Sequence, residues 1–325
     1  MVSLLVRYCL AVCRLISSIG LSAVYLDGWV SAIWIVVFYL SIAAVFLFKC
    51  KGISQMLIPF ATAIVTLLVS HAAITLYYAS ASATFTAIDV GQGQCICVLS
   101  GKRAVLIDCG STSYAEYDAG DRAAAYLRSR GIDSVDAIVF THLHEDHANG
   151  FKRLCASMSV KKVVIPEKLD KDEELLWEII SCAIAHGAEV ERASGGELEF
   201  CGRICLSLLS TEARGDQNER CMPVIVSVGS YDMIVTGDAP SSAEKAMIGQ
   251  RELSGIEALV VGHHGSKTSS CEEYLRAVSG RTAIISVGKN NYGLPSPEVL
   301  ERLNAFGYTV FRTDRDGNVE IRVDG

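Results

Sequence analysis

Charged residues are nearly absent from the first 80 positions of this 325-residue chain. That stretch holds only Arg7, Arg14, Asp27, Lys49 and Lys51. Two runs without any charge, 29–48 and 56–80, are each long enough to cross about 30 Å of hydrocarbon as a helix. Buried core helices of a soluble protein are the weaker alternative, because two such runs in succession are rare there. The apolar region continues well beyond any plausible cleavage point, which argues against a cleaved signal peptide.

We expect residues 1–80 to form two or three transmembrane helices and residues 84–325 to form a separate domain. Two arginines interrupt the third of these spans, which would precede Asp27. Lys49 and Lys51 lie between the two clear spans, and the positive-inside rule assigns this short loop to the cytoplasm. The next span then leaves the cytoplasm. The sequence therefore predicts a multi-pass protein of the cell membrane with an extracytoplasmic C-terminal domain.

The twelve cysteines include no Cys-x-x-Cys pair, the spacing typical of many cysteine-based zinc and redox motifs. They are spread from Cys9 to Cys271, and the C-terminal domain is large enough to bury a core without disulfides. We therefore interpret most of them as small buried apolar residues. The sequence leaves open whether one or two disulfides form.

From residue 84 onward, short apolar runs typical of strands alternate with helical segments. The expected strands cover 84–90, 95–99, 104–108, 136–140, 163–165, 204–209, 223–228, 233–236, 257–261 and 283–287. The expected helices cover 121–130, 173–186 and 297–306. Asp316 and Gly317 predict a closing hairpin. This interleaving indicates a mixed α/β domain.

Five of the seven histidines lie in two short motifs. The first motif follows an apolar run typical of a strand and holds three imidazoles and two carboxylates within six residues. On an extended segment His142 and His144 point the same way, and Asp146 and His147 follow as the chain turns. One loop can then supply two adjacent ions, His142 and His144 for one, Asp146 and His147 for the other. A solvated turn is a much weaker interpretation of this motif.

Further metal ligands must come from distant parts of the chain. Asp238 follows an expected strand and is a candidate bridging carboxylate. His263 and His264 also follow an expected strand, and we expect only one of them to bind metal. Asp108 ends another strand and is a candidate to orient a histidine ring from behind the metal. Because each follows the carboxyl end of a strand, one rim of the domain can gather them all.

The spacing predicts a centre with two divalent ions and hydrolytic chemistry. Two ions a few Å apart would hold a hydroxide, lower its pKa toward neutrality and clamp an oxygen undergoing displacement. Histidine and carboxylate ligands suit both zinc and manganese, so the sequence leaves the native ion open. Asp146 and Asp238 are the carboxylates on which we expect catalysis to depend.

Several short motifs occur in a specific order along the C-terminal domain. They lie at residues 88–93, 106–110, 142–147, 235–238, 262–269, 286–293 and 312–314. In this order they resemble the C-terminal part of ComEC-type competence proteins, which belong to the metallo-β-lactamase superfamily. The resemblance covers residues 84–325 and implies an αββα sandwich with its site along an open edge. It also implies an extracytoplasmic hydrolase domain, attached to a membrane channel, that degrades one DNA strand during uptake.

The motifs also suggest which residues meet the substrate. Lys267 is expected to act with Asp146 and Asp238, and Ser266, Lys289 and Asn290 are expected substrate contacts. Residues 81–325 carry 25 basic and 35 acidic residues, a net charge of −10 that repels a polyanion. Two divalent ions restore positive charge locally, and within about 8–10 Å a local field outweighs net charge.

The leading hypothesis is a membrane-anchored two-metal phosphodiesterase that cleaves DNA, with single-stranded DNA as the expected substrate. Other components of a DNA-uptake channel are possible partners. Two alternatives stay open at this point. One is hydrolysis of another phosphoester or an ester at the cell surface, and the other is a non-catalytic component of a DNA-uptake channel.

The sequence departs from the family pattern at several places. Gln94 stands where an acidic residue is usual, and Leu294 stands where a histidine is usual. The separate middle metal histidine of the superfamily has no counterpart, because only His186 lies in that interval and it belongs to an expected surface helix. We therefore expect the first ion to be held less tightly. Residues 1–80 match only the last transmembrane spans of the family's channel region, which leaves open whether the chain is a fragment of a longer protein.

Overall fold

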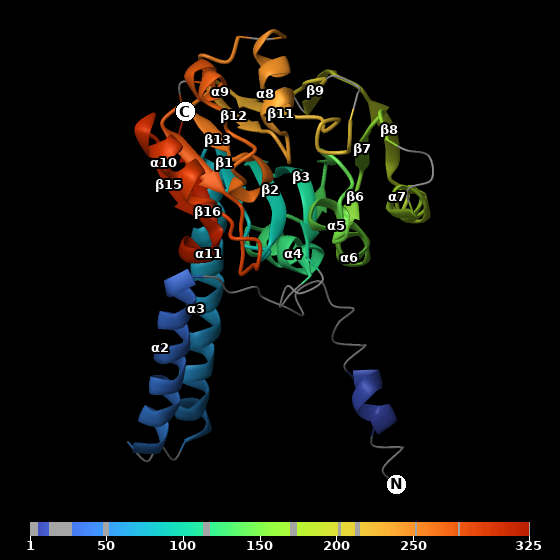
Figure 1. Cartoon of the computed structure of the whole chain (residues 1–325). Coiled ribbons are helices and arrows are strands. Elements are labelled where there is room, and N and C mark those ends of the chain that lie inside the picture. The colour runs from blue at the N-terminus through green and yellow to red at the C-terminus, as the bar shows by residue number, and fades with distance from the viewer. Residues whose placement is uncertain are drawn as a thin grey trace. The chain divides into compact units, whose positions relative to one another are not determined.

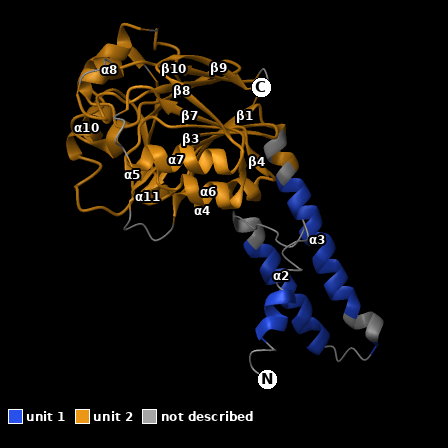
Figure 2. Ribbon diagram, turned by 90° about the vertical axis from the view of Figure 1, so that its right-hand side faces the viewer, with its two compact units in different colours: residues 1–75 blue, residues 76–325 orange. Residues whose placement is uncertain are grey.

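The structure is a computed structural model that describes residues 6–12, 28–47, 52–112, 118–169, 174–200, 203–211, 215–250, 252–278 and 280–324. The chain divides into two compact units, residues 1–75 and 76–325, coloured separately in Figure 2.

The first unit is helical. Helix α2 (Gly28–Leu47) and helix α3 (Ile53–Ser80) are joined by Trp34, whose Nε1 donates to the carbonyl of Ala63 at 3.0 Å. Large apolar side chains on both helices are exposed, among them Leu40 and Leu68. Among the described residues, one stretch is long and apolar enough to cross a membrane, Leu57–Ile74, whereas α2 holds a shorter apolar stretch, Ala32–Leu47. The third expected span, before Asp27, lies mostly outside the described residues, which include only 6–12 of it.

The second unit contains two sheets, each of seven strands within the described residues. The first has the order β16-β1-β2-β3-β5-β7-β8. Its strands are β1 (Ala83–Ala87), β2 (Gly93–Ser100), β3 (Arg103–Ser111), β5 (Ala137–Val139), β7 (Lys162–Pro166), β8 (Glu189–Ala193) and β16 (Val319–Val323). A separate small pair is formed by β4 (Ser134–Val135) and β6 (Ser159–Val160).

The second sheet has the order β15-β14-β13-β12-β11-β10-β9. Its strands are β9 (Gly196–Phe200), β10 (Ile204–Leu208), β11 (Val224–Val228), β12 (Tyr231–Val235), β13 (Ala258–Val260), β14 (Thr282–Ile285) and β15 (Thr309–Arg312). Strands β12 to β15 are parallel to one another, as are β3, β5, β7 and β8 in the first sheet. Parallel neighbours end at the same edge of a sheet, so the loops that follow them come together there.

Helices cover the outer face of each sheet (Figure 1). The longer helices are α4 (Ala119–Ser129), α6 (Phe151–Ser157) and α7 (Glu174–Ala185) on the first sheet, and α8 (Ser241–Ile248), α9 (Glu272–Val278) and α10 (Pro297–Ala305) on the second. Between the sheets, buried side chains of both interdigitate, including Phe85, Ile107, Val226 and Val260. The mixed α/β sandwich expected from the sequence is thus confirmed, in four layers with apolar contacts at every boundary.

The closing hairpin expected at Asp316 and Gly317 is wrong. A short helix, α11 (Thr313–Asp316), connects β15 to β16, and these two strands lie in different sheets. The expected strands also omitted β8 and β9, one edge strand of each sheet, which carry four glutamates between them. Charged residues are tolerated at edges because one side of the strand faces solvent, so the apolar run that marks a central strand is missing.

One glycine lets a strand of the first sheet approach the histidine motif. Helix α5 (Glu145–Ala148) lies against β3, and a Cβ added to Gly110 would lie 2.4 Å from the backbone nitrogens of His147 and Ala148. Two hydrogen bonds hold this contact, from Gly150 N to the carbonyl of Cys109 and from Ser111 N to Oδ1 of Asn149. Any side chain at residue 110 would therefore push α5 away from the sheet.

Substitution of Gly110 by alanine is expected to destabilise the fold by roughly 3 kcal/mol, because the added methyl meets backbone atoms that cannot move independently. The matched control is Gly249→Ala at the end of α8, where the nearest atom to an added Cβ is 3.9 Å away, and it should change stability by less than about 0.5 kcal/mol. Thermal unfolding of the full chain in detergent compares the two. Equal unfolding temperatures would show that β3 and α5 are not in tight contact.

Candidate metal centre

A buried carboxylate lies behind the histidine motif. Asp108 is fully buried in β3 and accepts four hydrogen bonds. The backbone nitrogen of Thr141 donates to Oδ1 at 2.7 Å. Its Oδ2 accepts from Thr141 Oγ1 at 2.8 Å, from His147 Nδ1 at 2.8 Å and from Gln94 Nε2 at 2.7 Å. Asp108 therefore fixes the loop after β5 relative to β2 and β3.

These hydrogen bonds decide which nitrogen of each imidazole is free to bind an ion. His147 directs its Nδ1 proton to Asp108, so Nε2 is the nitrogen left to bind an ion. Thr141 gives its hydroxyl proton to Asp108, so at 3.1 Å it accepts the Nδ1 proton of His142. In both rings Nε2 is left as the ligand atom. Asp108 acts directly on one histidine and through Thr141 on the other.

The adjacent histidines His263 and His264 have different environments. Both have left-handed backbone conformations, with φ of 51° and 52°, which separates their side chains. His264 is buried, its Nδ1 lies 2.8 Å from the carbonyl of Ser286, and its Nε2 lies 3.3 Å from Asp146 Oδ2. The side chain of His263 is 34% exposed, and its Nε2 lies 3.6 Å from Asp238 Oδ2. The geometry favours His264 as the ligand and leaves His263 on the open side.

Two groups of three donor atoms result. Within each group the donor atoms lie within 4.8 Å of one another, and the groups are His142, His144 and Asp238, and Asp146, His147 and His264. Asp238 faces both. Its Oδ1 lies 3.0 Å from His147 Nε2 and its Oδ2 lies 3.8 Å from His142 Nε2. One carboxylate oxygen is thus available to each group.

The arrangement of the donor atoms suits cation binding better than hydrogen bonding among the donors themselves. His147 Nε2, His264 Nε2 and Asp238 Oδ1 are buried, and none of them makes a well-oriented hydrogen bond to the described residues, although two of them lie 3.0 Å apart. Buried polar atoms are rarely left unpaired. His142 Nε2 and His144 Nδ1 are 3.2 Å apart, close to the roughly 3.3 Å edge expected for two nitrogens about 2.0–2.1 Å from a tetrahedral ion.

Burial and charge set the protonation of the donors. Burial, assisted by the neighbouring His147, holds the pKa of His142 well below its ordinary value. Burial by itself would lower the pKa of His147, but the carboxylates of Asp238 and Asp108 hold it well above its ordinary value. Burial would raise the pKa of Asp238, and here His147 and His264 prevail and hold it well below. Without an ion the centre therefore keeps a proton on His147 that metal binding must release.

The remaining residues expected at the site lie in two loops. Ser266 and Lys267 follow the short helix η1 (Gly262–Gly265), where Ser266 Oγ lies 2.9 Å from Thr268 Oγ1 and Lys267 is exposed. Lys289 is exposed in the loop after β14. Asn290 uses its side chain within that loop, where it donates to two backbone carbonyls and accepts from two backbone nitrogens. A substrate contact through Asn290 stays a prediction.

Sequence reasoning missed Thr141, Ser286 and Gln217, each of which positions a site residue. Gln217 Oε1 accepts from the backbone nitrogen of Leu143 at 3.3 Å. Thr141 directly precedes the histidine motif and Ser286 directly follows a strand, and these positions were the available signals. Gln94 stands where the family usually has an acidic residue, and its Nε2 donates to Asp108. A carboxylate at residue 94 would instead repel the carboxylate of Asp108.

Comparison with known proteins agrees with this fold. Residues 88–289 match the family model described as Metallo-beta-lactamase superfamily. YhfI from Bacillus subtilis, a metallo-β-lactamase fold protein, superimposes with a TM-score of 0.52 at 14% identity over 74% of this chain and 99% of its own. CmlA, a diiron β-hydroxylase from Streptomyces venezuelae, gives 0.53 at 14% identity over 75% of this chain and 54% of its own. At such low identity these likenesses concern the fold alone.

Sequence relatives include competence proteins. ComE operon protein 3 of Bacillus subtilis is 32% identical over 72% of this chain and 32% of its own length. Competence protein ComA of Neisseria gonorrhoeae is 28% identical over 74% and 32%. Recombination protein 2 of Haemophilus influenzae is 28% identical over 72% and 28%. The chain thus spans about a third of the length of these relatives, and the resemblance expected from its motifs is confirmed. The chain belongs to the metallo-β-lactamase superfamily.

Proposed function

We propose that this protein is a membrane-anchored two-metal hydrolase that cleaves DNA as a phosphodiesterase, with single strands as its substrate. The observation that carries the proposal is Asp238, whose two oxygens face two separate groups of metal-ligand atoms. The similarity to proteins named for competence supports DNA as the substrate. Other components of a DNA-uptake channel would be its partners.

In this proposal each donor group would hold one divalent ion, zinc or manganese, and Asp238 would offer one oxygen to each group. When bound, two such ions supply Lewis acidity and an activated water for displacement at phosphorus. The residues of the chain prepare the centre beforehand. Asp108 and Ser286 fix the tautomers of His147 and His264, and burial of His142, His147, Asp238 and His264 limits the access of bulk water to these donors.

Substrate contacts would come from the open side of the centre. His263 is partly exposed next to Asp238, and we propose that it meets a phosphate oxygen. Lys267 lies three residues beyond His264, and Lys289 three residues beyond Ser286, so both exposed ammonium groups follow segments that hold the centre. Their charge supports approach of a phosphodiester to a domain that is acidic overall.

The helical unit supports a membrane anchor. Its two long helices expose leucine, isoleucine, valine and phenylalanine side chains, and lipid would cover such surfaces. We propose that residues 1–80 form the anchor and that residues 84–325 form an extracytoplasmic hydrolase domain. Lys49 and Lys51, on which the orientation depends, lie outside the described residues.

The full chain in detergent, supplied with Mn²⁺ or Zn²⁺, is expected to cleave end-labelled single-stranded DNA. Asp146→Ala should reduce the rate by at least about a hundredfold, because a ligand of one ion is lost. Asp133→Ala is the matched control, since Asp133 is exposed in the turn before β4 and should leave the rate unchanged. Gel electrophoresis of the products measures each rate.

Other results of this assay would contradict the proposal in distinguishable ways. Turnover of a small phosphoester or ester with intact DNA would indicate a different hydrolase of the cell surface. Absence of both bound metal and turnover would indicate a non-catalytic component of an uptake channel.

The two adjacent histidines should separate metal binding from substrate contact. His264→Ala is expected to lower the metal content by one ion per chain, because its buried Nε2 belongs to a donor group. His263→Ala, the matched control, should keep the metal content and lower turnover by roughly tenfold or more, as loss of a charge-assisted contact would. Plasma mass spectrometry counts the ions. An equal loss of metal in both variants would be incompatible with these roles.

The orientation is testable in intact cells. A C-terminal epitope is expected to be removed by protease added outside the cytoplasmic membrane, because the second span should leave the cytoplasm. An epitope inserted between Lys49 and Lys51 should be protected and provides the control. Protection of the C-terminal epitope with digestion of the loop would reverse the assigned topology.

A further inference from the structure

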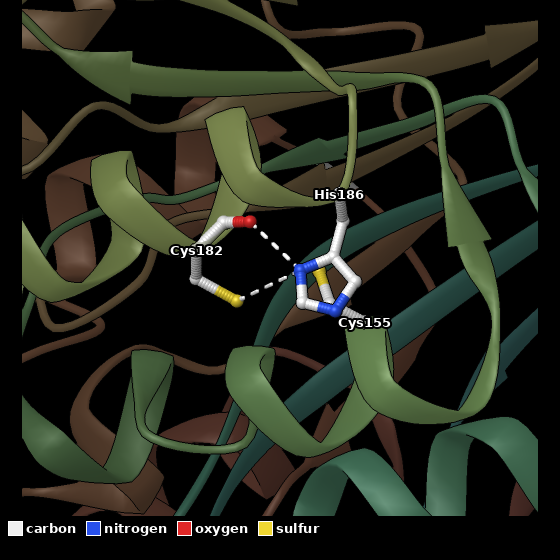
Figure 3. Close-up of side chains that lie close together, drawn as sticks. All are labelled: Cys155, Cys182 and His186. Atoms are coloured by element: carbon white, nitrogen blue, oxygen red, sulfur yellow. Dashed lines mark hydrogen bonds between the residues drawn. The ribbon is translucent and has the colours of Figure 1, made fainter.

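Three metal-ligand side chains gather in the helix layer over the first sheet, outside the centre described above. Cys155 belongs to α6, Cys182 belongs to α7 and His186 follows the end of α7. One donor atom of each lies within 4.8 Å of those of the other two, and Figure 3 shows the three side chains turned toward one another. None of them belongs to either donor group of the main centre.

Cys182 and His186 are spaced by one helical turn. The backbone nitrogen of His186 donates to the carbonyl of Cys182, so the helical path continues between them and both side chains project from one face. Cys182 Sγ and His186 Nδ1 are 3.7 Å apart. A tetrahedral ion about 2.3 Å from sulfur and about 2.0–2.1 Å from nitrogen would place these atoms roughly 3.5–3.6 Å apart. The pair therefore already has the separation of two zinc ligands.

Cys155 supplies the third donor from a different helix. It is buried in the core cluster of this layer, Cys182 packs against the same cluster, and their sulfur atoms lie within 4.8 Å of each other. Packing explains the two cysteines but not the imidazole beside them, because His186 is exposed and could point into solvent. Its Nδ1 now lies 2.9 Å from the carbonyl of Cys182, and ligation through this atom would replace that hydrogen bond.

Charge balance favours an ion over ionised thiols alone. A divalent ion that displaces both thiol protons, and binds a neutral imidazole, forms a unit with no net charge. Burial of such a neutral unit costs less free energy than burial of a single thiolate. Sulfur ligands also favour zinc over manganese, which prefers oxygen.

We propose that Cys155, Cys182 and His186 form a third metal site, selective for zinc and similar thiophilic ions, with solvent at the fourth position. Three protein ligands leave that position open on the exposed side of His186. A bound ion would fasten α7 to α6. Since α6 directly follows the helix that carries Asp146 and His147, the site would also steady the segment that supports the main centre.

Cobalt tests the proposal, because thiolate ligands give Co²⁺ an intense near-ultraviolet charge-transfer band and histidine or carboxylate ligands do not. The reduced full chain in detergent is expected to develop this band up to one equivalent per chain. Zn²⁺ should abolish the band and Mn²⁺ at the same concentration should not. Cys182→Ser should remove it, and His186→Ala should weaken Co²⁺ binding by roughly tenfold or more.

Cys205→Ser is the matched control, since Cys205 is also half-buried but belongs to strand β10 of the other sheet, and it should keep the band. His264→Ala should keep it as well, which separates this site from the main centre. Cys155 is buried, so the partly exposed Cys182 and His186 carry the test. A reduced chain that binds Co²⁺ without the band, or a band that survives Cys182→Ser, would overturn the proposal.

Discussion

The candidate metal centre depends on the hydrogen bonds that the buried carboxylate of Asp108 accepts. It accepts hydrogen bonds from the loop after β5 and from Gln94 on β2, so three segments of the first sheet converge on one group. Those bonds also fix which nitrogen of His142 and His147 is left to bind an ion. Gly110, two residues further along β3, permits the backbone of α5 to approach closely enough for this arrangement.

The second sheet completes the centre from the opposite side. Asp238 follows β12 and His264 follows β13, and both reach the donor atoms of the histidine motif within 4 Å. The apolar core between the sheets sets their spacing, because side chains from both faces fill it. A change in that packing would move Asp238 relative to His147, so the geometry of the candidate metal centre depends on the packing between the two sheets.

Opposite electrostatic demands meet in this domain. Its net charge is negative, yet the donor groups are arranged for two cations and the exposed lysines follow segments that hold them. In the proposed function, two bound divalent ions would reverse the local charge where a phosphodiester would bind. The proposed cysteine and histidine site follows a similar logic, because a bound cation would stabilise thiolates in an apolar layer.

The sequence alone determined the mixed α/β class, the metal-binding motifs and their order. Strand ends carry these motifs, and parallel strand ends meet at one edge, so the convergence of His142, Asp238 and the 263–264 pair followed from local pattern. It did not determine that residues 313–316 form a short helix between two sheets and not a hairpin, because strand pairing across two sheets depends on long-range contacts. Nor did it choose between His263 and His264.

Only the tertiary structure favours His264, through the left-handed backbone that turns one ring inward and the carbonyl of Ser286 that holds it. It likewise brought Cys155 to Cys182 and His186, which sequence reasoning had read as separate core and surface residues. The physical reason is the same in each case. Residue spacing fixes which side chains share a strand or a helical face, whereas contacts between elements are fixed by how their buried faces pack.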